Sequence, residues 1–159
     1  MAVDIELLKQ LREETGAGIA DCRSALVEAK GNASASSAQV MDKAKEILKQ
    51  KGLDKAGSKS DREAGEGIVE AYSHNGKIGV LVELRCETDF VAKTEDFKTL
   101  AHEIALQIAS MDPEDPESLL KQEYIRDPGM KIEDLIKLSI AKLGENIKIG
   151  RFARISLGK

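Results

Sequence analysis

Apolar residues recur at helical spacing in three stretches near the start of the chain, and each stretch predicts a helix. The turns "TGAG" and "KGNAS" (30–34) end the first two helices. The third helix is expected over residues 37–51, closed by Gly52. The apolar faces expected for the three helices carry, in order, Ile5, Leu8 and Leu11 with Leu7 beside them; Ile19, Cys22, Ala25, Leu26 and Ala29; and the buried Val40, Ala44, Ile47 and Leu48. We therefore predict a three-helix bundle over residues 1–52.

The spacing changes after residues 53–65, a polar stretch that predicts an exposed linker. "GIVEAYSHNGKIGVLVELRC" gives two short runs joined at Asn75-Gly76, which is a strong hairpin signal. The final run, "NIKIGRFARISL", also alternates and predicts a third strand beside the hairpin. One face of the second run carries Ile78, Val80, Val82 and Leu84, and one face of the final run carries Ile147, Ile149, Arg151, Ala153, Ile155 and Leu157.

Two helices are predicted between the hairpin and the final strand. The first begins after Thr94, a suitable N-cap, and the second spans about 132–143 and ends at Gly144. The first is expected to carry an apolar stripe of Phe97, Leu100, Ala101, Ile104, Ile108 and Met111. The proline-rich stretch between them predicts an irregular crossing with at most a short helix around Leu119. Residues 66–159 are therefore expected to form an α+β domain with a three-stranded antiparallel sheet and helices on one side.

Composition places the chain among ordinary globular proteins, since 42% of its 159 residues are hydrophobic and 33% are charged. A net charge of −4 argues against a nucleic-acid binder that relies on a basic surface. No apolar run approaches the length of a membrane span, and the first residues do not read as a signal peptide. Two cysteines without metal or redox spacing fit reduced, buried thiols, so we expect a cytoplasmic protein.

Candidate catalytic groups are present, but their spacing does not bring them together. Cys86, His74, His102 and Asp89 supply the residue types of a thiol nucleophile and its base, yet nothing enforces hydrogen-bond reach between them. Neither a phosphate-binding loop nor a carboxylate set for a metal is evident. We expect no enzyme activity, no catalytic residue, no cofactor and no metal, and instead a protein that binds another protein.

The stretch "RCETDFVA" lies between the second predicted strand and the following helix. Two interpretations are open for its phenylalanine. In the first, Asp89 caps the next turn and Phe90 folds into the core. In the second, Phe90 faces outward on a tight corner and anchors a partner, where burial of the ring is worth about 1.5–3 kcal/mol.

Three longer stretches resemble one family. "LREETGAGIADCRSALVEAKGN", "GVLVELRCETDFVAK" and "IAKLGENIKIGRFARI" are together similar to elongation factor Ts, the nucleotide-exchange factor of the GTPase elongation factor Tu. The resemblance covers both predicted domains in order. It implies a chain that binds the GDP form of elongation factor Tu and promotes GDP release, without direct contact to nucleic acid or membrane.

The resemblance also implies site residues. "TDFV" (Thr88, Asp89, Phe90 and Val91) matches the family motif that inserts between two helices of the GTPase near its magnesium site, with Asp89 and Phe90 as the intruding residues. The first 52 residues resemble the family's ubiquitin-associated-like docking domain. That similarity puts Arg12, Ile19 and Ala20 at or near the contact with the GTPase.

The stretch from Met111 to Met130 is too short for the second core subdomain that many family members carry. In this the chain is similar to short forms that act as homodimers, which implies a dimer joined through the sheet or helix face of residues 66–159. Two alternatives remain at this point. One is a helical adaptor that recognises another protein through the "TGAG" turn, and the other is a thiol-dependent enzyme that uses Cys86.

Overall fold

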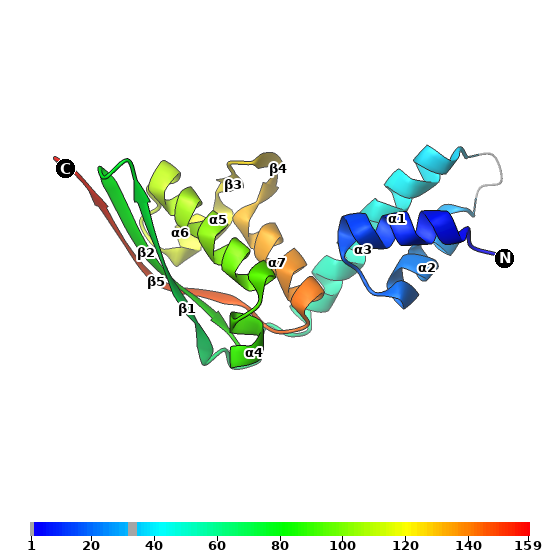
Figure 1. Cartoon of the computed structure of the whole chain (residues 1–159), viewed down its shortest axis with the longest axis horizontal. Coiled ribbons are helices and arrows are strands. Elements are labelled where there is room, and N and C mark those ends of the chain that lie inside the picture. The colour runs from blue at the N-terminus through cyan, green and yellow to red at the C-terminus, as the bar shows by residue number, and fades with distance from the viewer. Residues whose placement is uncertain (1, 32–34) are drawn as a thin grey trace. The chain divides into compact units, whose positions relative to one another are not determined.

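The computed structural model describes residues 2–31 and 35–159 and divides into two compact units, Met1–Lys55 and Ala56–Lys159. Figure 1 shows the helices and strands of both units. Most of the "KGNAS" turn predicted to end the second helix lies outside the described residues. The predicted division at residues 52 and 66 stays a prediction.

The first unit is built from the three predicted helices, α1 (Ile5–Thr15), α2 (Ile19–Ala29) and α3 (Ser37–Gly57). α1 begins after Asp4, whose carboxylate accepts a hydrogen bond from the Glu6 backbone N–H at 3.0 Å. The buried core of the unit consists of Leu11, Cys22, Ala25, Leu26, Ala29, Val40, Met41, Ala44 and Leu48. The likeness of this bundle to a ubiquitin-associated domain stays a prediction.

Two details of the predicted bundle are wrong. Ile5 and Ile19, the first residues of their helices, are 66% and 54% exposed, so their side chains lie outside the core, although Val3 and Ala17 two residues earlier pack against it. α3 does not stop at Gly52 but continues to Gly57. A glycine inside a helix costs only about 1 kcal/mol relative to alanine, and the last two residues of α3 already belong to the second unit, whose core includes Ala56.

The second unit contains the predicted three-stranded antiparallel sheet, so its α+β class is confirmed. The strands are β1 (Glu66–His74), β2 (Ile78–Cys86) and β5 (Lys148–Ser156), in the order β1-β2-β5. The hairpin turns at Asn75 and Gly76, both with positive φ (52° and 66°), as this turn requires.

Four helices belong to this unit: α4 (Asp89–Ala92), α5 (Glu95–Met111), α6 (Pro116–Lys121) and α7 (Ile132–Leu143). α5 packs on β1 and β2, and α5 and α7 lie on the same side of the sheet (Figure 1). The predicted stripe of α5 is buried from Phe97 to Ile108, whereas Met111 is 49% exposed at the helix end.

β5 contains a bulge that breaks the predicted alternation. Val82 of β2 pairs with Phe152, whereas Leu84 pairs with Ile149, so three steps along β5 match two steps along β2. The irregularity lies opposite Glu83, and an extra residue of this kind moves the following side chains to the other face of the sheet.

The bulge reverses which β5 side chains face the core. Phe152 packs against the core cluster, while Ile155 and Leu157 are 74% and 76% exposed. The Glu83 carboxylate accepts a hydrogen bond from the Arg151 backbone N–H at 3.3 Å and stabilises the irregular pairing. The predicted shared face from Ile147 to Leu157 is therefore wrong beyond the bulge.

The proline-rich crossing is more ordered than predicted. α6 is the short helix expected around Leu119, but it is followed by a two-stranded sheet of β3 (Glu123–Tyr124) and β4 (Asp127–Lys131). Buried Gln107 of α5 holds this sheet, because its amide donates to the Glu123 carbonyl and accepts from the Ile125 N–H, both at 3.0 Å.

Candidate functional site

The turn between β2 and α5 is capped at both ends. The Thr88 hydroxyl oxygen accepts a hydrogen bond from the Val91 N–H at 3.4 Å and caps α4. The Thr94 hydroxyl donates to the Val91 carbonyl at 2.7 Å, and its oxygen accepts from the Phe97 N–H at 3.3 Å. α4 is thus a single structured turn that leads directly into α5.

Phe90 projects from this turn. It is 80% exposed, more than any other large apolar side chain among the described residues. Its neighbours face the other way, since Val91 packs against the core and Ala92 is 5% exposed. Phe90 therefore faces outward and does not fold into the core, so the first interpretation is wrong, whereas the part of the second in which Phe90 anchors a partner stays a prediction.

Asp89 lies in the first turn of α4, but the N-cap is Thr88. The Asp89 carboxylate accepts a hydrogen bond from the Lys93 ammonium at 3.0 Å, one helical turn away. This bond and the positive charge of Lys93 lower the pKa of the Asp89 carboxyl. A charged carboxylate therefore stands beside the exposed ring at neutral pH.

Two residues that the sequence did not single out support the turn. Glu145 accepts hydrogen bonds from Thr88, and the Asn146 N–H donates to the Glu87 carboxylate at 2.7 Å. Both follow α7, at a sequence distance of more than 50 residues from the turn. The sequence "GENI" does place polar residues between a helix and a strand, which indicates a polar loop there. Nothing in its spacing predicts that this loop contacts Glu87 and Thr88.

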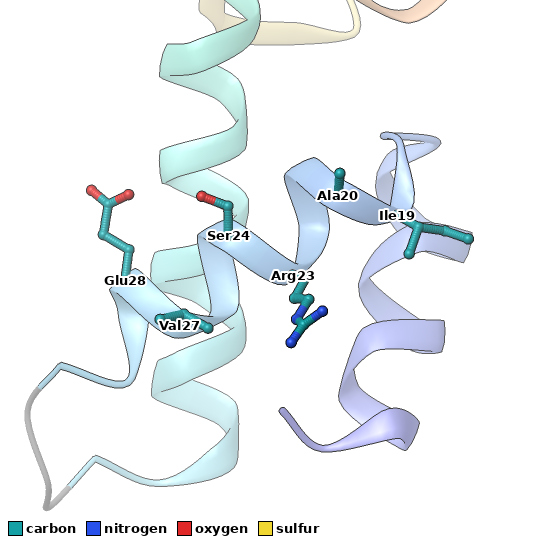
Figure 2. Close-up of a pocket in the computed structure, with 6 residues that line it drawn as sticks. All are labelled: Ile19, Ala20, Arg23, Ser24, Val27 and Glu28. Carbon is teal, nitrogen blue, oxygen red and sulfur yellow. The ribbon is translucent and has the colours of Figure 1, made fainter. Parts of the chain in front are cut away.

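The predicted contact residues of the first unit lie on exposed positions. Ile19 and Ala20 are exposed on α2, and with four further residues they line a surface depression: Arg23, Ser24, Val27 and Glu28 (Figure 2). Arg12 is exposed on α1 and does not line this depression.

One side of that depression is fixed by α3. The Lys51 ammonium donates to the Ser24 hydroxyl at 3.2 Å and to the Glu28 carboxylate at 3.1 Å. The other side carries Ile19 and Val27, which are 54% and 42% exposed, with Arg23 between them along α2. α2 therefore presents a short apolar edge next to a polar one.

The candidate catalytic residues do not form a site. Cys86 is fully buried, its thiol donates to the Thr88 carbonyl at 3.1 Å, and burial raises its pKa to about 11. A buried thiol of raised pKa is a poor nucleophile. The hydrogen-bond partners of His74 are Tyr72 and Asn75, and that of His102 is Glu70, so neither imidazole contacts this thiol.

Within residues 2–31 and 35–159, no cluster of three or more histidine, cysteine, aspartate or glutamate side chains could hold a metal ion. In the same described part of the chain, no helix combines the length and apolarity needed to cross a membrane. Prominent exposed apolar features of the surface are the projecting Phe90, the apolar edge of α2, and Val69, Leu81 and Ile155 on the sheet. The fold and this site define a two-unit α+β protein with an exposed apolar turn between its central strand and its longest core helix.

Comparison with known proteins names the family. A family model described as "Elongation factor TS" matches residues 87–159. Elongation factor Ts of Coprothermobacter proteolyticus is 42% identical over all of this chain and all of its own length, and that of Fervidobacterium nodosum is 38% identical with the same coverage. The chain belongs to the elongation factor Ts family, and the resemblance seen in the sequence is confirmed.

The relatives differ in length. Elongation factor Ts of Nostoc punctiforme is 44% identical over 99% of this chain, which spans 47% of that relative. The match to the Coprothermobacter protein extends over 205 residues, against 159 in this chain. Even relatives that match throughout therefore have residues that this chain lacks.

Proposed function

We propose that this chain is a guanine-nucleotide exchange factor for elongation factor Tu in protein synthesis. It binds the GDP form of that GTPase and promotes GDP release by inserting Thr88–Val91 near the magnesium site. The observation that carries the proposal is the 80% exposure of Phe90 on a turn that is capped at both ends. Membership of the elongation factor Ts family supports the choice of partner.

The exposed ring gives the chain a source of binding energy. A buried phenylalanine contributes about 1.5–3 kcal/mol relative to an exposed one. Phe90 does not contribute this to its own fold, so the gain is available when a partner covers the ring. A few such side chains usually dominate the energetics of an interface.

Exchange follows from linkage between the two ligands of the GTPase. GDP in such proteins is held through phosphate contacts and a bridging magnesium ion. A ring wedged between packed helices favours a discrete rearrangement of the elements that touch this ion. The factor then lowers the affinity for nucleotide, and by reciprocity bound nucleotide lowers the affinity for the factor. The chain makes and breaks no covalent bond in this scheme, so we infer that it is not an enzyme.

The first unit would supply a second contact. We infer that the three-helix unit docks on the nucleotide-binding domain of elongation factor Tu through Arg12, Ile19 and Ala20, as a ubiquitin-associated-like module. The exposed apolar edge of α2 supports this role. Two contacts on one chain raise the effective concentration of each for its target.

A homodimer is part of the proposal. Val69 (67% exposed), Leu81 (52%) and Ile155 (74%) lie on β1, β2 and β5, on the face of the sheet away from the core. Leu81 pairs with Ala71 on one side and Ala153 on the other, so the patch is continuous across the three strands. An apolar patch of this kind supports association through the sheet. We expect the assembly to act in the cytoplasm, without direct contact to nucleic acid.

Release of a fluorescent GDP analogue from elongation factor Tu tests the proposal. Addition of the chain should accelerate release strongly, in proportion to its concentration below saturation. The alternative, a helical adaptor without exchange activity, predicts that release stays at its spontaneous rate even where binding is detected. An unchanged rate would therefore contradict the exchange function and favour the adaptor.

A further inference from the structure

The turn that carries Phe90 is attached to the loop between α7 and β5. The Thr88 N–H donates a hydrogen bond to Glu145 Oε2 at 2.8 Å, and the Thr88 hydroxyl donates to Glu145 Oε1. One carboxylate thus accepts both hydrogen bonds that Thr88 can donate. Hydrogen bonds to an ionised acceptor are about twice as strong as those between neutral groups.

This carboxylate also determines how Thr88 caps α4. Because the hydroxyl proton points to Glu145, the lone pairs of the hydroxyl oxygen are left for the Val91 N–H. α4 has only four residues, and a helix this short is not stable on its own. Its geometry therefore depends on contacts such as this one.

Asn146 connects the same loop to a third segment. Its side chain is 2% exposed and donates to the carbonyls of Ser60 at 3.3 Å and Arg62 at 2.6 Å. Its backbone N–H donates to Glu87, which also lies 3.6 Å from the Arg62 guanidinium. The loop that carries Glu145 is thus itself fixed before it reaches Thr88.

We propose that Glu145 is a positioning residue for Phe90. Its carboxylate keeps the Thr88–Val91 turn formed in the free protein with the ring outward, so that the partner does not have to order the turn on binding. The inference rests on the proposed exchange function, since the ring is what acts on the GTPase. Glu145 itself need not touch the partner.

Three substitutions of Glu145 distinguish a positioning role from a general contribution to the stability of the fold. Glu145→Ala removes both acceptors, and Glu145→Asp shortens the side chain by one methylene, so both should weaken the turn. Glu145→Gln keeps one acceptor for the Thr88 N–H and can donate to the hydroxyl oxygen, so it should retain most of the function. Glu117→Ala is the control, because Glu117 is an exposed glutamate of α6 whose carboxylate accepts a hydrogen bond from the Lys121 ammonium at 3.0 Å, one helical turn away.

The first measurement is amide hydrogen exchange in the free, full-length chain. Glu145→Ala should speed exchange at the Thr88 and Val91 amides about tenfold or more, as loss of a charge-assisted bond predicts. Core amides of α5, such as that of Ile104, should keep their protection. Unchanged protection at Thr88 and Val91 would overturn the proposal, and so would an equal loss of protection throughout the unit.

The second measurement is acceleration of GDP release from elongation factor Tu. Glu145→Ala should reduce it about tenfold in the wild-type background and have no further effect in the Phe90→Ala background, which is the signature of coupling. An equal reduction in both backgrounds would overturn the positioning role. If Phe90→Ala alone leaves release unchanged, the exchange function fails, and amide protection still decides whether Glu145 holds the turn.

Discussion

Gly67 of β1 lies so close to Leu84 of β2 that a Cβ atom on Gly67 would stand 2.0 Å from the Leu84 carbonyl oxygen. The backbone of Gly67 also has a φ of +150°, which side chains rarely allow. The two residues lie at the end of the hairpin next to the exposed turn, since Gly67 pairs with Arg85 one residue before Cys86.

Gly67→Ala should therefore destabilise the second unit strongly. The obstacle is backbone rather than a movable side chain, and we expect a loss of about 3 kcal/mol or more in the free energy of unfolding. Urea unfolding followed by circular dichroism measures the loss. Gly79→Ala is the matched control, since a Cβ there meets nothing within 4 Å, and it should change stability by less than about 1 kcal/mol. Equal stability of the two variants would contradict the close approach.

Much of the fold could be predicted because each main element carries its own local signal. The Asn75-Gly76 turn, the Thr94 cap and the end of α7 at Gly144 are each determined by a few neighbouring residues. The stripe from Phe97 to Ile108 is long enough to define one helix face. Such signals do not depend on what the rest of the chain does.

The sequence-based predictions are wrong where residues far apart in the chain determine the local structure. Glu83 and Arg151, 68 residues apart, stabilise the bulge that turns Ile155 outward, and the alternation of β5 gives no sign of it. The β3–β4 sheet depends on Gln107, which belongs to a helix stripe in the sequence but folds its amide onto a later segment. Local pattern could not reveal either contact.

Only part of the candidate site could be predicted, because distant residues also determine the structure of the Thr88–Val91 turn. A four-residue helix has no periodicity, so the direction of Phe90 could not be read from spacing, and the family resemblance supplied the motif instead. The residues that hold the motif, Glu145 and Asn146, follow a different helix. Their roles become visible only once the two segments are side by side.

Stability should depend on pH through Cys86. Burial raises the pKa of its thiol from an ordinary 9.0 to about 11, so the folded state keeps a proton that the unfolded state releases. The stabilising contribution is complete below pH 9 and is lost as the pH rises toward 11. Urea unfolding between these values should show stability falling more steeply for the wild type than for Cys86→Ala.

Tyr124 also has a raised pKa, about 12, because of burial and its hydrogen bond to Glu103. Tyr124 affects the pH dependence of stability equally in the wild type and in Cys86→Ala, so its contribution cancels when the two curves are compared. Parallel curves for the wild type and Cys86→Ala would contradict a buried, protonated thiol. Slow reaction of the native chain with thiol reagents at neutral pH is expected for the same reason.

The proposed dimer predicts a mass of twice 17.3 kDa by light scattering at micromolar concentration. Leu81→Lys and Ile155→Lys should each give a monomer, because either change puts a charge in the apolar patch. Ile125→Lys is the control, since Ile125 is 39% exposed on the segment between β3 and β4. A monomeric wild-type chain would contradict association through the sheet.

The central claim is that Phe90 acts outside its own fold, and truncation of the ring separates this from a structural role. Phe90→Ala should leave the free energy of unfolding within about 0.5 kcal/mol of the wild type, as for other exposed positions. Phe97→Ala, in the buried core, should lower the free energy of unfolding by about 3–5 kcal/mol. It is the control for a phenylalanine with a structural role.

Release of a fluorescent GDP analogue from elongation factor Tu, measured with wild-type chain and with Phe90→Ala at equal concentration, is the most direct test. The wild type should accelerate release, and Phe90→Ala should lose about tenfold or more of that acceleration while remaining folded. Asp89→Ala should lose less, because the ring stays in place. Release that is as fast with Phe90→Ala as with the wild-type chain would contradict the account.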